Sequence, residues 1–329
     1  MLRAAGLTAA VALLLFVAAL SIAVGTKSIP LSTVLSGLFA PDGSEDAVIV
    51  QDYRLTRTLL GLAVGVGFGL SGALMQALTR NPLADPGLLG ITSGASAAVV
   101  LGIGVFGAGT LAGYVWFAFA GAAATSVAVY LLGTAAPGPA SPVRLVLAGT
   151  AVNASLIAGI SALTFLDRDS FKELRTWSVG SLAGRDHGVL LQVLPFLAAG
   201  TVLALALAGP LNAMALGDDL GNALGARVVR TRVLGAVAVT LLCGAATAAV
   251  GPIGFVGLVV PHAVRLVCGP DQRWALPYCL VLSPTLLLSA DVLGRILVRP
   301  DELAVGIVTA AIGAPVLIVL VRRRKVPQL

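Results

Sequence analysis

The chain has 329 residues, of which 58% are hydrophobic and 11% are Asp, Glu, Lys or Arg; its mean hydropathy is +1.00 and its formal net charge +6. Soluble domains carry about 25% charged residues, so the composition excludes a water-soluble globular protein. Disorder is excluded because so much of the chain must leave water. We therefore predict a membrane protein with no nucleic-acid partner, since no basic stripe interleaves with aromatic residues.

Charged residues divide the chain into long uncharged intervals, and a membrane-spanning helix needs about 20 apolar residues. The intervals are 4–26, 58–79, 86–143, 145–166, 187–217, 233–264, 274–290 and 303–321. The first is too long for the apolar region of a signal peptide and predicts a retained span.

Two of these intervals exceed one span. The interval 86–143 has a natural break at 107–110, and 233–264 is divided by 251–254, which leaves a short helix over about 255–268. The prediction is an all-α fold, a single transmembrane domain over 1–329 with about ten transmembrane helices, one of them short or re-entrant.

An even number of spans places both termini on one side of the membrane. The basic tail, residues 322–325, is expected to be cytoplasmic because Lys and Arg are enriched there. With this orientation the inside holds twelve basic residues and the outside nine. Both termini are therefore predicted to be cytoplasmic, chiefly on the strength of the tail.

The inside loop 209–232 contains a short polar helix. Asp218 is expected to cap it, Asp219 suits its positive end, and Gly225 suits its termination. Leu220 and Leu224 share one apolar face. Such a helix suits docking into a groove on a soluble partner, and the alternative is a surface helix lying on the bilayer.

Two stretches rich in Pro and Gly interrupt the predicted helices. The first holds Asn81, Pro82 and Pro86, and the second is Gly251-Pro252-Ile253-Gly254. Proline removes a backbone donor and restricts the residue before it, and irregular backbone at membrane depth must be buried or line a wet cavity. We interpret both stretches as hinges on a transport path, against the alternative of plain turns.

The predicted outside carries arginines where they are disfavoured. Arg54 and Arg57 precede the second span, and Arg295 ends the ninth. Snorkelling to the interface would explain them, but an acidic soluble partner would also be attracted to them. His262, which has no carboxylate or second histidine near it in the sequence, is interpreted as a packed residue.

Several kinds of chemistry have no motif in this sequence. None of the three lysines follows a glycine, so there is no nucleotide-binding P-loop. Paired intramembrane carboxylates, protease motifs and cysteine or histidine spacings typical of metal sites are also missing. These absences argue against an enzyme, a metal site and a proton-coupled carrier.

The interrupted stretches and their neighbours carry a resemblance to a known family. The sequence is similar to the FecCD family of permease subunits, which belong to importers of ferric siderophores, haem and vitamin B12. Nearly the whole chain resembles the family, and its finer features resemble the first permease subunit of ferric-enterobactin importers. The matching stretches are 54–57, 71–76, 80–87, 141–145, Trp177, 180–182, 251–262 and 313–316.

The resemblance implies a permease subunit that moves a ferric siderophore, of catecholate type, across the bacterial cytoplasmic membrane. It implies a second permease subunit, with a heterodimer favoured over a homodimer, two cytoplasmic ATPases that bind ATP and Mg²⁺, and an extracytoplasmic binding protein. This chain would hold no cofactor and no catalytic residue.

The resemblance also assigns roles to individual positions. Arg54, Arg57 and Arg295 match positions that meet the binding protein, and Ser141 and Pro142 lie at the cytoplasmic gate. Loop 211–226 matches the ATPase-coupling element. The coupling residues are expected to be Leu216, Gly217, Asp218, Asp219, Ala223, Leu224 and Gly225.

Two other interpretations stay open at this point. A haem or vitamin B12 importer of the same family is the first. An ion-coupled secondary transporter is the second, and the missing intramembrane carboxylates count against it.

Overall fold

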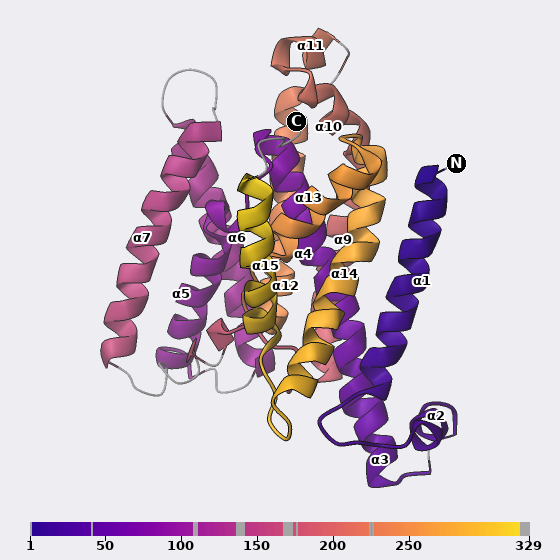
Figure 1. Cartoon of the computed structure of the whole chain (residues 1–329). Coiled ribbons are helices and arrows are strands. Elements are labelled where there is room, and N and C mark those ends of the chain that lie inside the picture. Colours follow the sequence, from indigo (N-terminus) through magenta and orange to yellow (C-terminus); the bar gives the residue numbers. More distant parts are fainter. Residues whose placement is uncertain are drawn as a thin grey trace.

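The protein is all-helical over the part of the chain that the structure, a computed structural model, describes. The described residues are 2–40, 42–107, 111–135, 142–166, 174–175, 177–223, 225 and 227–322. They form a bundle with the short helices α10 and α11 at one end and α2 and α3 at the other (Figure 1). The predicted fold class is confirmed, because no strand occurs in these ranges.

The helices follow the predicted spans with short connections between them. In chain order they are α1 (Leu2–Ala23), α2 (Leu31–Phe39), α3 (Glu45–Val48), a π-helical turn η1 (Ile49–Leu55), α4 (Thr56–Thr79), a 3₁₀ turn η2 (Pro86–Leu89), α5 (Ile91–Gly104), α6 (Leu111–Thr134), α7 (Pro142–Leu166), α9 (His187–Ala206), α10 (Ala208–Ala215), α11 (Asp218–Ala223), α12 (Val228–Val250), α13 (Val256–Cys268), α14 (Gln272–Leu297) and α15 (Val305–Arg322).

Seven helical stretches in the described residues are long and apolar enough to cross a membrane. Three shorter apolar helices, α5, α13 and α15, occupy the remaining predicted intervals. The count of ten spans stays a prediction. The two predicted breaks are confirmed, because α5 ends and α6 begins on either side of 107–110, and α12 and α13 flank 251–254.

Two helices extend further than the charge-free intervals predicted. Helical structure runs continuously from Glu45 through α4, and α14 continues past Asp291 and Arg295. Both extensions carry charged residues into the bundle. Arg57 and Asp291 pair between the two extensions, as described below, and this pairing offsets part of the cost of burying the two charges.

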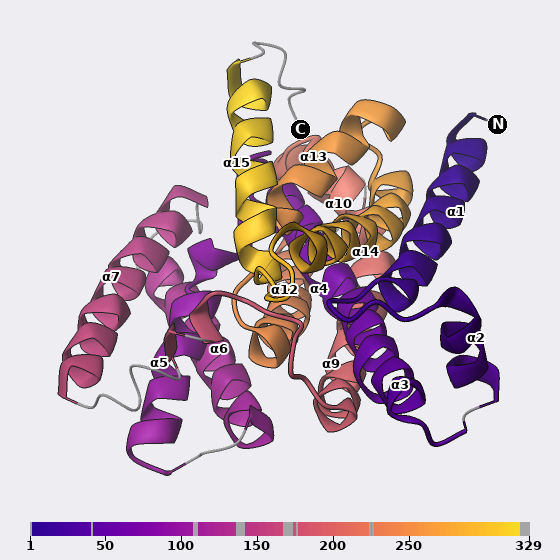
Figure 2. The same cartoon turned by 60° about the horizontal axis from the view of Figure 1, so that its bottom comes forward.

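Helix α4 lies in the middle of the bundle, in contact with α9, α12, α13 and α14 (Figure 2). Small residues let the backbones approach closely. A Cβ at Gly72 would lie 1.9 Å from the carbonyl oxygen of Gly257 in α13, and one at Gly65 would lie 2.5 Å from Cα of Pro284 in α14. These contacts leave no room for larger residues.

Helices α1 and α7 lie at the periphery. Only 6% of the residues in the apolar stretch of α7 are buried, and only 17% of those in the apolar stretch of α1. Such faces suit lipid or a partner subunit. The start of α1 and the end of α15 lie toward the same end of the bundle as α10 and α11 (Figure 1), as the even span count predicted. Which side of the membrane this end faces stays a prediction.

Candidate functional site

The two interrupted stretches meet at one small cavity inside the bundle. Asp85 and Pro86 reach it from the connection between α4 and η2, and Pro252 and Gly254 from the break between α12 and α13. Phe68 and Thr92 are also in its wall. The sequence indicated each break separately, and their meeting is a result of the fold.

The cavity is too small to hold a bulky substrate. Its volume is 180 Å³, whereas sites for small organic molecules occupy about 300–1,000 Å³. Its lining residues hold the backbone of the interrupted stretch in place: the carboxylate of Asp85 accepts a 2.7 Å hydrogen bond from the backbone N–H of Gly87.

Other residues predicted for the gate lie outside this cavity. Asn81 and Pro82 lie just after α4, where the side chain of Asn81 accepts a hydrogen bond from Leu83 N. Pro142 is the first residue of α7, and Ser141 lies outside the described residues, as does the side chain of Pro142.

Gly251 is fixed by the segment around residues 177–182. It has φ of +79°, and a Cβ there would lie 2.1 Å from the carbonyl oxygen of Trp177. Ser181 N donates to Val250 O at 2.8 Å, and Gly306 N donates to Gly180 O at 3.0 Å. The segment therefore joins the break after α12 to the start of α15. In the sequence, Trp177 and residues 180–182 stood out only through the family resemblance.

At the C-terminal end of α4, Asp218 holds the α10–α11 segment against α4 and α12. Its carboxylate pairs with Arg80, which ends α4, and with Arg232 of α12 at 2.8 Å. Partial burial acts to raise the pKa of Asp218, but the hydrogen bond from Arg80 and the two positive charges lower it below its ordinary value. The carboxylate therefore stays charged at neutral pH.

The prediction that Asp218 caps α11 is wrong by one residue. Asp218 is the first residue of the helix, and Gly217, with φ of +108°, precedes it and accepts a hydrogen bond from Gly221 N. Its carboxylate pairs with Arg80 and Arg232 instead. Gly225 has φ of +84°, as expected for a residue that ends a helix.

The surface of this segment presents two leucines. Leu216 and Leu220 are each 59% exposed, next to Gly217, and Asp219 and Ala223 are exposed too. Leu224 lies outside the described residues. The predicted apolar face is therefore present in part.

A second tie, which sequence reasoning missed, joins α10 to α14. The side-chain amide of Asn212 donates to Asp271 Oδ1 at 2.5 Å and its oxygen accepts from Gln272 N at 2.8 Å. Asp271 caps α14 through Arg273 N, and this bond lowers its pKa most. In the sequence, an Asp just before an apolar run indicates the cap of α14. Nothing in the sequence indicated its partner in α10.

At the opposite end, Asp291 of α14 lies fully buried between two arginines. Arg57 of α4 approaches both of its oxygens, with Nη2 at 2.7 Å from Oδ1. Arg295 pairs with Oδ2 and donates from Nη1 to Ser21 O of α1 at 2.7 Å. Arg57 also binds Glu302 at 2.8 Å. These contacts tie α1, α4 and α14 together.

Arg54 is buried beside this cluster and binds the end of α1. Its guanidinium donates to the backbone carbonyls of Ile22, Ala23 and Lys27, at 3.1, 2.8 and 2.6 Å. Cations are favourable at the C-terminal end of a helix, where carbonyls lack partners. Arg54 and Arg295 thus use their donors within the chain, which sequence reasoning did not foresee.

A recess of 750 Å³ opens over this cluster. Arg54, Arg57 and Arg295 lie in its wall together with Lys27 and Glu302. Of the three predicted docking arginines, Arg57 has the most exposed side chain, at 14%. Their docking role stays a prediction.

His262 lies buried in α13, three residues before a buried arginine. Arg265 of the same helix donates to the side-chain oxygen of Gln76 in α4, whose amide donates to Gly257 O and Leu258 O at 3.3 Å. These contacts tie α13 to α4. Among the described residues, no group of three His, Cys, Asp or Glu side chains could hold a metal ion.

Comparisons with known proteins agree with this arrangement. A model of the FecCD transport family matches residues 13–323. The ferric enterobactin transport system permease protein FepD of Escherichia coli K12 is 49% identical over 98% of this chain and 96% of that protein. The Fe(3+)-citrate import system permease protein YfmD of Bacillus subtilis 168 is 39% identical over 95% of this chain and 93% of that protein. The chain belongs to the FecCD transport family.

A solved structure supports the same assignment for the FecCD chain. An inward-facing metal-chelate type ABC transporter matches it with a TM-score of 0.84 at 28% identity, over 98% of this chain and 99% of that chain. The expectation of a non-enzymatic permease subunit of an ABC importer is thereby confirmed. The chain is a membrane-embedded transport subunit of this class.

We predict that the buried carboxylate of Asp291 contributes most of the interaction energy that holds α1, α4 and α14 together at their end of the bundle. Asp291→Asn should destabilise the protein by about 3–5 kcal/mol, because it leaves two buried arginines without their counter-charge. Glu302→Gln should cost about 1 kcal/mol or less, since that side chain is partly exposed. Thermal unfolding of the purified protein in detergent measures both, and equal losses would contradict the assignment.

Proposed function

We propose that this FecCD chain moves a ferric siderophore of catecholate type into the cytoplasm by alternating access, powered by separate ATPase subunits. The main support for the mechanism is the α10–α11 segment, which Asp218 and Asn212 tie to α4, α12 and α14. A displacement of this segment would therefore be transmitted to three membrane-spanning helices. The support for the substrate is the similarity to the ferric enterobactin permease.

In the proposed assembly, the α10–α11 end and both termini face the cytoplasm. Leu216 and Leu220 would enter a groove on an ATPase, because exposed apolar side chains within and just before a short helix suit that mode of docking. A homologous second permease would complete the membrane part, with a heterodimer favoured. The binding protein would dock over the recess at the opposite end.

The transport proposal is tested by uptake into proteoliposomes holding the two permeases, with the ATPase inside and the binding protein outside. ATP-dependent accumulation of iron from ferric enterobactin is the expected result. Haemin, cobalamin and a ferric hydroxamate serve as competing cargos. Preference for haemin or cobalamin would move the chain to another branch of the family, and uptake driven by an ion gradient without ATP would overturn the mechanism.

We predict that Asp218→Asn lowers the number of iron complexes transported per ATP hydrolysed, because the segment is released from α4 and α12. The pair keeps its charge at every pH above the lowered pKa of Asp218, and its contribution would be lost only as pH falls through that pKa. The defect should therefore be the same at pH 6 and pH 8.

The double variant Asp218→Asn/Arg232→Gln should be no worse than the single variant, since residues in one ion pair are not additive. The matched control is Asp42→Asn, which removes an exposed carboxylate at the opposite end. A coupling ratio unchanged by Asp218→Asn would refute the coupling role.

For the binding protein, we propose that acidic side chains reach Arg57 within the recess, while Arg54 and Arg295 support the wall. Glu302 holds Nη1 of Arg57 at 2.8 Å and would compete with such a partner. Glu302→Gln should therefore tighten binding-protein docking at low salt, and Arg57→Gln should weaken it. Affinity is measured by surface plasmon resonance on folded protein. An equal loss in the control Arg175→Gln, an exposed arginine elsewhere in the chain, would point to general charge attraction instead.

A further inference from the structure

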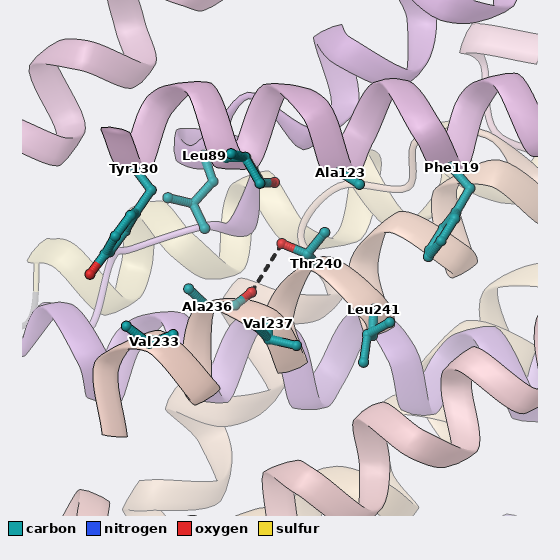
Figure 3. A pocket seen from close by; sticks show the side chains of 11 residues that line it. Leu89, Phe119, Ala123, Tyr130, Val233, Ala236, Val237, Thr240 and Leu241 are labelled. Atoms are coloured by element: carbon teal, nitrogen blue, oxygen red, sulfur yellow. Dashed lines mark hydrogen bonds between the residues drawn. The ribbon is translucent and has the colours of Figure 1, made fainter. Parts of the chain in front are cut away.

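A groove runs between α6 and α12 on the surface of the bundle. Its volume is 330 Å³, and its lining is almost entirely apolar. Figure 3 shows Phe119, Ala123 and Tyr130 on one side, facing Val237 and Leu241 on the other. Val237 of α12 is 44% exposed, so the groove opens away from the core, toward the surroundings of the bundle.

The groove continues into a basic recess at the start of α12. The recess has a volume of 500 Å³, Arg227 and Arg230 lie in its wall, and Val233 lines both cavities. Arg230, Val233, Val237 and Leu241 are spaced by three or four residues and therefore form one stripe along the helix. The basic residues and the apolar groove thus belong to one continuous surface.

The two arginines of the recess stand where a helix disfavours positive charge. The first turn of α12 carries no acidic residue, and the N-terminal end of a helix is its positive end. Arg232 is compensated by Asp218. Arg227 and Arg230 are exposed, and neither forms an ion pair with any residue that the structure describes. An anion from outside the chain would meet both guanidinium groups and the backbone N–H groups at the N-terminal end of α12.

The length of the stripe matches one half of a bilayer. Eleven residues separate Arg230 from Leu241, a distance of about 16 Å along a helix, and the hydrocarbon core of a bilayer is about 30 Å thick. A ligand that begins at the recess and follows the groove would therefore carry its negative charge at the membrane surface and an apolar chain to the bilayer centre. A phospholipid has this form.

We propose that the α6–α12 surface binds one anionic phospholipid of the leaflet at the α10–α11 end. Its phosphate lies against Arg227 and Arg230, and an acyl chain fills the groove. Tyr130 lies at the Val233 end of the groove (Figure 3), where the aromatic ring suits the boundary between chain and headgroup. The site adjoins the Asp218–Arg232 pair, and its existence does not depend on the identity of the transported cargo.

The test uses the delipidated transporter complex, with its ATPase, and native mass spectrometry. Equimolar phosphatidylglycerol and phosphatidylcholine are added, and one retained phosphatidylglycerol is expected per copy of the chain. Arg227→Gln/Arg230→Gln should lower its retention about tenfold, because two exposed ion pairs with the phosphate are lost and each such pair contributes only modestly. Ala236→Phe, which fills the groove, should lower retention of both lipids.

Matched controls separate this site from general attraction. Arg273→Gln removes an exposed arginine at the same end, and Ala199→Phe adds a ring to the exposed surface of α9; both should leave retention unchanged. Equal retention in the double arginine variant, or equal loss in the Arg273 variant, would overturn the proposal. So would displacement by inorganic phosphate, or binding to the isolated permease that disappears once the ATPase covers the recess.

Discussion

Close backbone contact along α4 is the constraint on which the rest of this structure depends. In a bilayer, helices gain little from hiding apolar surface from one another, so association relies on tight packing. Gly65 and Gly72 bring α14 and α13 against α4 at distances that no side chain would permit. The same helix bears Arg57 in its first turn and is followed by Arg80, about 35 Å away at 1.5 Å per residue. One continuous helix therefore connects the buried carboxylate at one end with the α10–α11 segment at the other.

Helices α12 and α13, which flank one of the interruptions, both pack against this central helix. Backbone that leaves the helix inside a membrane protein needs partners for its N–H and C=O groups. The break after α12 finds them in the segment around Gly180, which also reaches the first turn of α15. The break after α12 is thus bonded to the start of α15 and lies across the small cavity from the connection that follows α4.

Much of the fold could be predicted from the spacing of charges, because a charge in the hydrocarbon core is costly and marks the ends of spans. The two longest uncharged intervals are divided by the Gly-containing stretches 107–110, between α5 and α6, and 251–254, between α12 and α13. Charge spacing gives the wrong end of a helix where two charges neutralise each other across helices. Helix α14 runs past Asp291 because Arg57, far away in the sequence, is the partner of that carboxylate. The burial of Arg54 and Arg295 and their hydrogen bonds within the chain likewise had no signal in the sequence, and their docking role stays a prediction. Asp218 was expected to cap α11, and its pairing with arginines at the end of α4 and in α12 had no local signal either. Pairing between distant residues has no local signature.

The anchoring of α1 has a consequence for biosynthesis. This helix is mostly exposed, and its backbone carbonyls are held by Tyr278 near one end and by Arg295 near the other. Those partners lie 275 and 274 residues later in the chain. Synthesis proceeds from the N-terminus, so Arg54 can hold the end of α1 soon after that helix is made, whereas Tyr278 and Arg295 arrive only with α14. Until then α1 is held at one end alone and otherwise relies on its own apolar character, which its long uncharged sequence supplies.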